Sequence, residues 1–398
     1  MIYYLNDEKN YILEKDEKYM QRIIDNGDGT IKMGKSTYNV SREPRGCREK
    51  IWIHDSDNNR QATNYRNSNL LIKFNRNDVS CENYGEILYY AFLKSCGARC
   101  TKYELAELCE YDGEQEIKHS GVICPTYMHR ENEFEFSGLE LQRYQSLFKS
   151  SENKKTEPNT ISEYIECIRD LMMDPKEEML NQIKKDLIIM AFFDYITCQS
   201  DRHWGNVSFV FRAQEIVGHF SESLRVASSY DNGCSFMFNR KMQALETIAS
   251  QLKVAKHLKD TDRHTSILER ISNKSVPCLG IKTSVYNPPV GEGDDYPSKL
   301  QLNCDENWEE TFLNELCAEI IKDKQLVEFF RNKDLFKIDN ARPILEEQGD
   351  IVPEPLMYLA GEIVDYRADL VFKTLEKYKN SELLGLKSEE LRNGKPGY

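Results

Sequence analysis

The alternation of apolar and polar positions over the first 130 residues predicts short strands and one helix. Residues 51–54 and 69–74 are apolar runs on either side of a segment rich in Asp and Asn, a pattern typical of a hairpin. A helix is predicted next, with Ser80 as its N-cap and Gly97 closing it. Residues 121–125 predict a further strand that ends at its proline.

The pattern changes after residue 130. Residues 131–160 are polar and predict a linker region. Beyond them helical periodicity dominates, with Thr160 as a candidate cap for the first helix. The predicted helices cover residues 161–173, 184–196, 308–330 and 355–378, and an exposed loop covers residues 287–295. We therefore expect an α+β fold with an N-lobe at residues 1–130, the linker region at 131–160 and a helical C-lobe at 161–398.

Composition agrees with a folded chain of this size. Its 398 residues exceed the usual length of one domain, and 40% of them are hydrophobic against 30% charged. The formal net charge of −13 works against direct binding to nucleic acid or an anionic membrane, although a local basic cleft stays open as an alternative.

The sequence offers no feature of an exported protein. Its N-terminus has no secretory signal, and its longest apolar run, residues 187–193, is too short to span a bilayer. The twelve cysteines form no C-x-x-C pair, so neither a zinc ribbon nor a thioredoxin-like site is indicated. We expect a cytoplasmic protein with reduced thiols.

Candidate chemistry is concentrated in two polar loops of the C-terminal half. Asp201 precedes Asn206 by five residues between a predicted helix and strand, and an Asp-Asn-Gly loop begins at Asp231. Phosphoryl transfer requires a carboxylate that takes the proton of the attacking hydroxyl, and Mg²⁺ binds carboxylate and amide oxygens. These residue types also serve as turn and cap residues, and a second Asp-Arg-His triplet at Asp262 has no Asn five positions later. The context of the first triplet favours catalysis by Asp201 with Asn206 and Asp231 as metal ligands.

His203 and Trp204 stand inside the first loop. His203 either contacts a phosphate or holds the loop by hydrogen bonds to the backbone, and Trp204 is expected to pack.

The N-terminal half supplies candidates for nucleotide binding. Lys73 lies at the end of an apolar strand, from which it can reach a phosphate, and Glu86 on the next helix can orient it by an ion pair. Glu82, one turn away on the same helix, is an alternative partner. Residues 34–50 are the candidate phosphate-covering loop, although they contain neither G-x-G-x-x-G nor a Walker motif and equally fit a polar surface loop.

These motifs together resemble the HipA-like serine/threonine kinases of bacteria, which share the D-R-H-x-x-N loop with phosphoinositide kinases. The resemblance covers about residues 30 to 330. It rests on the segments Arg45-Gly46-Cys47-Arg48-Glu49-Lys50-Ile51-Trp52, Leu71-Ile72-Lys73-Phe74, Tyr84-Gly85-Glu86, Asp201-Arg202-His203-Trp204-Gly205-Asn206 and Tyr230-Asp231.

The resemblance implies a two-lobed protein-kinase-like fold that uses ATP and Mg²⁺. It implies Asp201 as catalytic base, with His203 beside it, Asn206 and Asp231 as magnesium ligands, and Lys73 as the phosphate-contacting lysine held by Glu86. It also implies a mobile phosphate-binding loop containing Gly46, Arg48 and Lys50. In some members that loop is switched off by phosphorylation of its own serine, for which Ser36 and Ser41 are available here.

The acceptor and the partners stay open at this point. Many members of the resembled family are toxins that pair with a DNA-binding antitoxin, so a protein substrate and an antitoxin partner are expected, with any DNA contact made through that partner. A phosphoinositide or small-molecule kinase, a pseudokinase interaction module and a nucleotidyl transferase are the alternatives.

Overall fold

The computed structural model describes most of the chain. The described residues are 21–25, 30–33, 36–43, 50–54, 70–75, 80–112, 115–125, 133–138, 141, 160–172, 175–202, 204–212, 224–273, 275–277, 279–283 and 307–393.

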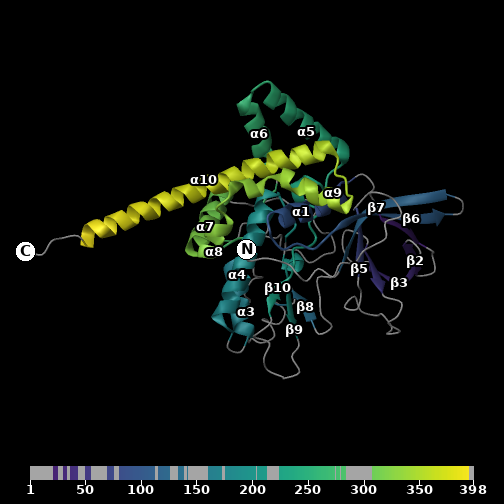
Figure 1. Cartoon of the computed structure of the whole chain (residues 1–398), viewed down its shortest axis with the longest axis horizontal. Helices are drawn as coiled ribbons and strands as arrows, with labels where there is room; N and C mark the ends of the chain where they lie inside the picture. Colours follow the sequence, from purple (N-terminus) through teal and green to yellow (C-terminus); the bar gives the residue numbers. More distant parts are fainter. Residues whose placement is uncertain are drawn as a thin grey trace, which may run out of the picture.

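Seven strands of the N-terminal part form a closed barrel in the order β1-β2-β3-β4-β5-β7-β6 (Figure 1). Their bounds are β1 Gln21–Asp25, β2 Thr30–Met33, β3 Ser36–Glu43, β4 Lys50–His54, β5 Leu70–Phe74, β6 Glu104–Asp112 and β7 Gln115–Pro125. All neighbours pair antiparallel except β1 and β6, whose parallel pairing closes the barrel. The hairpin predicted from residues 51–54 and 69–74 is confirmed as the β4–β5 pair.

Isoleucines at matching register positions fill the barrel. Ile51 lies opposite Ile72, and Ile72 opposite Ile123, so three β-branched side chains stand in one row across β4, β5 and β7. All three are buried in one apolar cluster, which Ile23 and Ile31 complete from β1 and β2. This packing fixes β5, the strand that carries Lys73.

Among the described residues before 130, the helix is α1, Glu82–Ser95. Its predicted end is confirmed, since Gly97 follows the C-cap with a φ of 74° that favours glycine. Its predicted N-cap is wrong: Cys81 occupies that position without a side-chain cap bond, while the Ser80 hydroxyl donates to the Glu82 carboxylate at 3.2 Å. That short-range bond uses the Ser80 side chain and leaves the helix to begin one residue later.

A second sheet of three strands lies in the C-terminal part, in the order β10-β9-β8. Its strands are β8 Glu133–Ser137, β9 Ser208–Arg212 and β10 Arg225–Val226. β8 lies inside the region 131–160 that was predicted as a linker, and its Phe136 stacks on Phe209 of β9 at a ring distance of 5.5 Å.

Helices make up the rest of the described C-terminal part. They are α3 Ile161–Leu171, α4 Glu177–Ile196, α5 Met242–His257, α6 Thr261–Ser272, α7 Trp308–Lys322, α8 Lys324–Phe329, α9 Arg342–Gln348 and α10 Glu354–Asn393, with 3₁₀ turns at η2 Trp204–Asn206, η4 Ser235–Met237, η5 Lys333–Phe336 and η6 Ile338–Ala341. Thr160 caps α3 in a reciprocal capping box with Glu163, as predicted. The single helix predicted at 308–330 is two helices, because the Asp323 side chain accepts from the Gln325 and Leu326 amides and starts α8.

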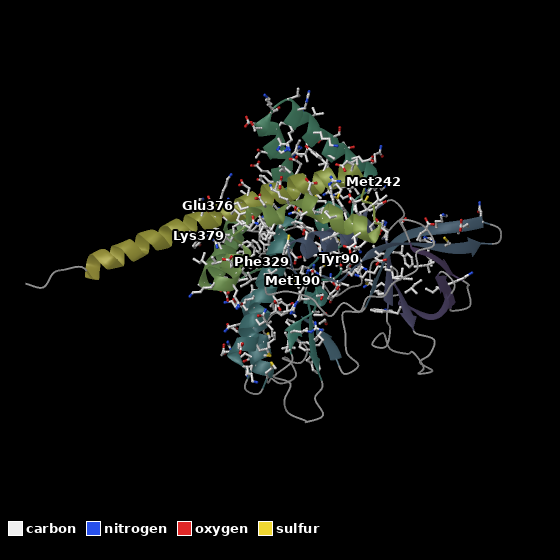
Figure 2. The ribbon with its side chains drawn as sticks, in the orientation of Figure 1. Tyr90, Met190, Met242, Phe329, Glu376 and Lys379 are labelled. Atoms are coloured by element: carbon white, nitrogen blue, oxygen red, sulfur yellow. The ribbon has the colours of Figure 1, made fainter. Side chains whose placement is uncertain are left out.

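α4 runs through the main core, and its C-terminal half is buried without interruption. Tyr90 of α1 and Met190 of α4 are buried in the main core, and Phe329 of α8 is partly buried against it (Figure 2). The α5–α6 pair stands on one side of α10, whose C-terminal end extends away from the body (Figure 1).

The mixed helix and strand class is confirmed. The main core also contains Leu71, Leu105 and Val122 of the barrel strands, so α1 and the barrel pack directly on the C-terminal helices. Over the described residues, no helix has both the length and the apolar character needed to cross a membrane.

Candidate functional site

The loop that follows α4, residues 197–206 and hereafter the Asp201 loop, is closed by its own side chains. The Asn206 side-chain amide donates to the Asp201 carbonyl at 2.7 Å. Gln199 accepts from the Asp201 backbone N–H at 3.3 Å and donates to the Asp231 carbonyl at 2.8 Å. Since α4 and β9 on either side are buried, these bonds hold Asp201 and Asn206 on a fixed support.

The second loop, residues 229–234 and hereafter the Asp231 loop, has a strained backbone. Asp231 has a φ of 56°, a conformation uncommon for any residue but glycine. Its N–H donates to the Tyr103 hydroxyl at 3.2 Å, and the Asn232 N–H donates to Glu86 Oε2 at 2.7 Å. Contacts from Tyr103, the residue before β6, and from Glu86 of α1 therefore hold this unusual conformation in place.

Lys73 joins the barrel to these loops. Its side chain is 3% exposed, and its ammonium lies 3.6 Å from Glu86 Oε1 and 3.5 Å from Asp231 Oδ1. It also donates to the Tyr103 hydroxyl at 3.3 Å. Of the two carboxylates expected as partners, the structure brings Glu86 to Lys73, while Glu82 bonds Ser80.

Arg202 is a buried residue of the site to which sequence reasoning assigned no role. Its guanidinium is fully buried and forms two bonds with Asp194 of α4, at 3.1 and 3.2 Å. It further donates to the carbonyls of Asn206 and Tyr230 and to the side chains of Ser229 and Asn232. Arg202 thereby links α4 and both loops.

The charge of this pair is fixed by its surroundings. Burial by itself lowers the pKa of Arg202. The Asp194 carboxylate and other neighbours raise this pKa by more than burial lowers it, so the net shift is upward. Burial raises the pKa of Asp194, and Arg202 acts against that rise. A guanidinium stays protonated in proteins, which makes Arg202 a permanent positive centre under the loops.

The remaining charge suits a divalent cation. Glu86 and Asp231 place two carboxylates at the ammonium of Lys73, while Arg202 and Asp194 pair with each other. Mg²⁺ binds proteins through one or two carboxylate or amide oxygens and completes its shell with water and phosphate. Asp231, 19% exposed, and the amide oxygen of Asn206 fit that donor set. No cluster of three or more His, Cys, Asp or Glu side chains suited to a metal occurs among the described residues.

Several predicted residues fall outside this constellation. His203, Gly46 and Arg48 lie outside the described residues. Lys50 begins β4 and is the register partner of Lys73 on β5. The prediction that residues 34–50 form one loop is wrong over Ser36–Glu43, which pairs with β2 and β4 as strand β3. Ser36 and Ser41 are therefore strand positions.

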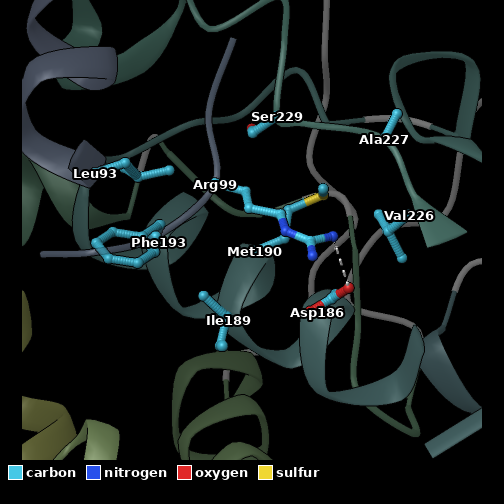
Figure 3. A pocket seen from close by; sticks show the side chains of 10 residues that line it. Leu93, Arg99, Asp186, Ile189, Met190, Phe193, Val226, Ala227 and Ser229 are labelled. Carbon is cyan, nitrogen blue, oxygen red and sulfur yellow. Dashed lines mark ion pairs between the residues drawn. The ribbon is translucent and has the colours of Figure 1, made fainter. Parts of the chain in front are cut away.

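Behind the Asp231 loop lies a small cavity of about 30 Å³, shown in Figure 3. Arg99 and Asp186 form an ion pair at its edge with 3.7 Å between Nη1 and Oδ2, and Ser229 borders it from the loop. Burial raises the pKa of Asp186 to about 6, which Arg99 opposes. The space holds about one water molecule and is far smaller than typical ligand sites, so it is no nucleotide pocket.

Comparison with known proteins gave matches among solved structures alone. No protein-family model and no curated protein matches the chain. The Helicobacter pylori proinflammatory kinase CtkA aligns with a TM-score of 0.49 at 14% identity, over 85% of this chain and 97% of that one. The Shewanella oneidensis toxin–antitoxin protein HipA, solved with HipB and operator DNA, aligns with a TM-score of 0.44 at 10% identity, over 84% of this chain and 67% of that one. Membership of the resembled family stays a prediction.

Proposed function

We propose that this chain is an ATP- and Mg²⁺-dependent phosphotransferase that transfers a phosphoryl group to a serine or threonine hydroxyl of a protein. One observation carries the proposal: Lys73, buried at the end of its strand, meets both Glu86 of α1 and Asp231 of the second loop within 3.6 Å. A buried lysine between a helix carboxylate and a loop carboxylate is the arrangement that protein kinases use around ATP phosphates.

At the nucleotide, Lys73 contacts phosphate oxygens, and Glu86 together with the Tyr103 hydroxyl holds its side chain. The Tyr103 hydroxyl suits this task because burial, with the nearby Glu86 charge, raises its pKa well above the ordinary value. Tyr103 stays a neutral hydroxyl that accepts from Lys73 and from the Asp231 N–H.

Asn206 and Asp231 hold Mg²⁺, which supplies positive charge to the phosphate oxygens when bound. Gln199 and Arg202 keep these two ligands at a fixed spacing, because each bonds both loops.

Asp201 accepts the proton of the attacking hydroxyl. The hydroxyl oxygen forms a bond to the γ-phosphorus, the bond to the β,γ-bridging oxygen breaks, ADP leaves, and the proton goes to the Asp201 carboxylate. An antitoxin-like protein partner is implied only by the family resemblance.

The test incubates the purified chain with γ-labelled ATP and Mg²⁺ and locates label by mass spectrometry, with Asp231→Asn as the matched variant. We expect label on a serine or threonine of the chain or of an added protein. The variant should lose metal-dependent ATP binding together with transfer. Absence of both label and metal-dependent ATP binding in the wild type would reject the proposal in favour of a pseudokinase.

A further inference from the structure

Gly85 lies on α1 directly against the Asp231 loop. A Cβ added to Gly85 would stand 2.8 Å from the Gly233 carbonyl oxygen and 3.2 Å from its carbon. Real Cβ atoms essentially never come within 3.0 Å of another heavy atom, and the obstacle here is backbone, which cannot rotate aside. Only glycine fits at this position without moving the helix or the loop.

The helix itself gives no reason for a glycine there. A glycine inside a helix costs about 1 kcal/mol relative to alanine, and Gly85 is the fourth residue of α1. Gly361 inside α10 provides the contrast, because its added Cβ would meet a side-chain methyl of Ile338 at 3.0 Å and no backbone atom of a loop. The close approach to the Asp231 loop accounts for Gly85.

The residues around Gly85 show what this approach positions. Glu86 follows directly, and its Oε2 accepts from the Asn232 N–H at 2.7 Å while its Oε1 lies 3.6 Å from Lys73. At the start of the helix the Cys81 N–H donates to the Phe238 carbonyl at 2.9 Å. α1 is thus docked on the segment 232–238 at two places, and Gly85 sits between them.

We propose that Gly85 is a positioning residue that sets the spacing between α1 and the Asp231 loop, so that a single carboxylate, Glu86, serves both Lys73 and the loop. The proposal rests on the proposed function in one respect, that the Asp231 loop binds the metal–nucleotide complex. A methyl group at position 85 separates α1 from Gly233 and weakens the bonds of both Glu86 oxygens. The loop then loses its support and Asp231 its fixed place.

The test compares Gly85→Ala with Gly361→Ala in the full chain. Amide hydrogen exchange of residues 231–238 is measured without nucleotide or metal, and the Mg²⁺ concentration for half-maximal ATP binding is measured separately. For Gly85→Ala we expect exchange about tenfold faster across 231–238, a lower melting temperature and about tenfold more Mg²⁺. For Gly361→Ala we expect wild-type exchange and Mg²⁺ values.

The two readouts separate the two proposals. Wild-type exchange in a folded Gly85→Ala protein would overturn the positioning role, whatever the ATP result. Faster exchange in a chain whose wild type binds no Mg²⁺–ATP would support the positioning role and reject the proposed function.

Glu86→Gln decides the matter if Gly85→Ala yields no folded protein, because it keeps the size of the side chain and leaves Gly85 intact. Wild-type exchange across 233–238 in Glu86→Gln would mean that the carboxylate does not support the loop, which overturns the proposal that Gly85 acts through Glu86. Exchange about tenfold faster would support the proposal, because the loop then depends on the contact that Gly85 permits.

Discussion

The chain contains the triplet Asp-Arg-His twice, at residues 201–203 and 262–264, and the two copies differ in almost every physical respect. Arg202 is 1% exposed and bonds α4 and both acidic loops. Arg263 is exposed in the first turn of α6, where Asp260 caps the helix by accepting from its backbone N–H at 3.0 Å. The same letters make the centre of a site in one place and an ordinary helix start in the other.

This difference shows that the role of an Asp-Arg-His triplet depends on the residues that its side chains contact in the fold. Asp194 is eight residues before Arg202 and Asn232 thirty residues after it, and only the fold brings all three together. In the second copy a long-range hydrogen bond of 2.8 Å joins His264 Nε2 to Glu362 Oε2 and attaches α6 to α10.

The largest expected difference between the copies is in stability. Arg202→Ala leaves the Asp194 carboxylate buried without its counter-charge, so we expect a loss of about 3–5 kcal/mol in the free energy of unfolding. Arg263→Ala, at an exposed position, should stay within about 0.5 kcal/mol of wild type. Urea denaturation followed by circular dichroism measures both, and equal losses in the two variants would show that the two arginines do not differ in their contribution to stability.

Completing the second motif provides the next test. Ile267 stands where an Asn would give Asp262 the same spacing as Asp201 and Asn206. Ile267→Asn replaces a buried apolar side chain of α6 with an amide, and we expect it to lower the free energy of unfolding by about 3 kcal/mol.

We expect the completed motif at residues 262–267 to have no phosphoryl-transfer activity of its own. Its residues lie in helix α6 and cannot adopt the loop conformation of residues 201–206. Ser266→Asn, exposed on the same helix, is the control and should change stability by less than about 0.5 kcal/mol. If adding Ile267→Asn to the Asp201→Asn variant restored phosphoryl transfer, the residue types and their spacing would be sufficient for activity without the loop.

The elements were predicted best where local signals decide them. Thr160 caps its helix, and Gly97 follows the end of α1, because both effects act within a few residues. The β8 strand was missed although Phe134 and Phe136 alternate with glutamates, since its stability comes from pairing with β9 more than seventy residues later. The break at Asp323 was missed because apolar periodicity continues across it.

The candidate site divides in the same way. Residue type and spacing pointed to Lys73, Glu86, Asp201, Asn206 and Asp231, and the structure brings Lys73, Glu86 and Asp231 together. Their catalytic and metal roles stay predictions. Tyr103 and Arg202 could not be predicted, because a buried tyrosine or arginine has no local sequence signal and its partners lie on other elements.

A smaller difference is expected when the aspartates of the two triplets are changed. Asp201→Asn keeps the shape of the side chain and removes the proton acceptor, so transfer should fall by on the order of a hundredfold, about 2.7 kcal/mol in activation free energy. Asp262→Asn changes an exposed side chain in the first turn of α6 and should leave the rate unchanged. Steady-state transfer of labelled phosphate checks both, and a wild-type rate in Asp201→Asn would remove it from the proposed mechanism.

The ion pair of Arg99 and Asp186 is intermediate in exposure between buried Arg202 and exposed Arg263. Arg99 is 34% exposed, and the two charged groups are 3.7 Å apart. Burial raises the pKa of Asp186 from 3.8 to about 6 in the folded chain, against the opposing charge of Arg99. The folded chain therefore binds more protons than the unfolded chain between pH 4 and 6, and its stability falls as the pH rises through that window. Solvent around Arg99 screens the pair, so we expect this titration to lower the free energy of unfolding by about 1–2 kcal/mol as the pH rises from 4 to 6. Asp186→Asn should remove this part of the slope in urea denaturation at pH 4, 5 and 6, while Asp262→Asn, an exposed carboxylate, should keep it; identical slopes in both variants would mean that the Asp186 carboxylate titrates as it does in the unfolded chain.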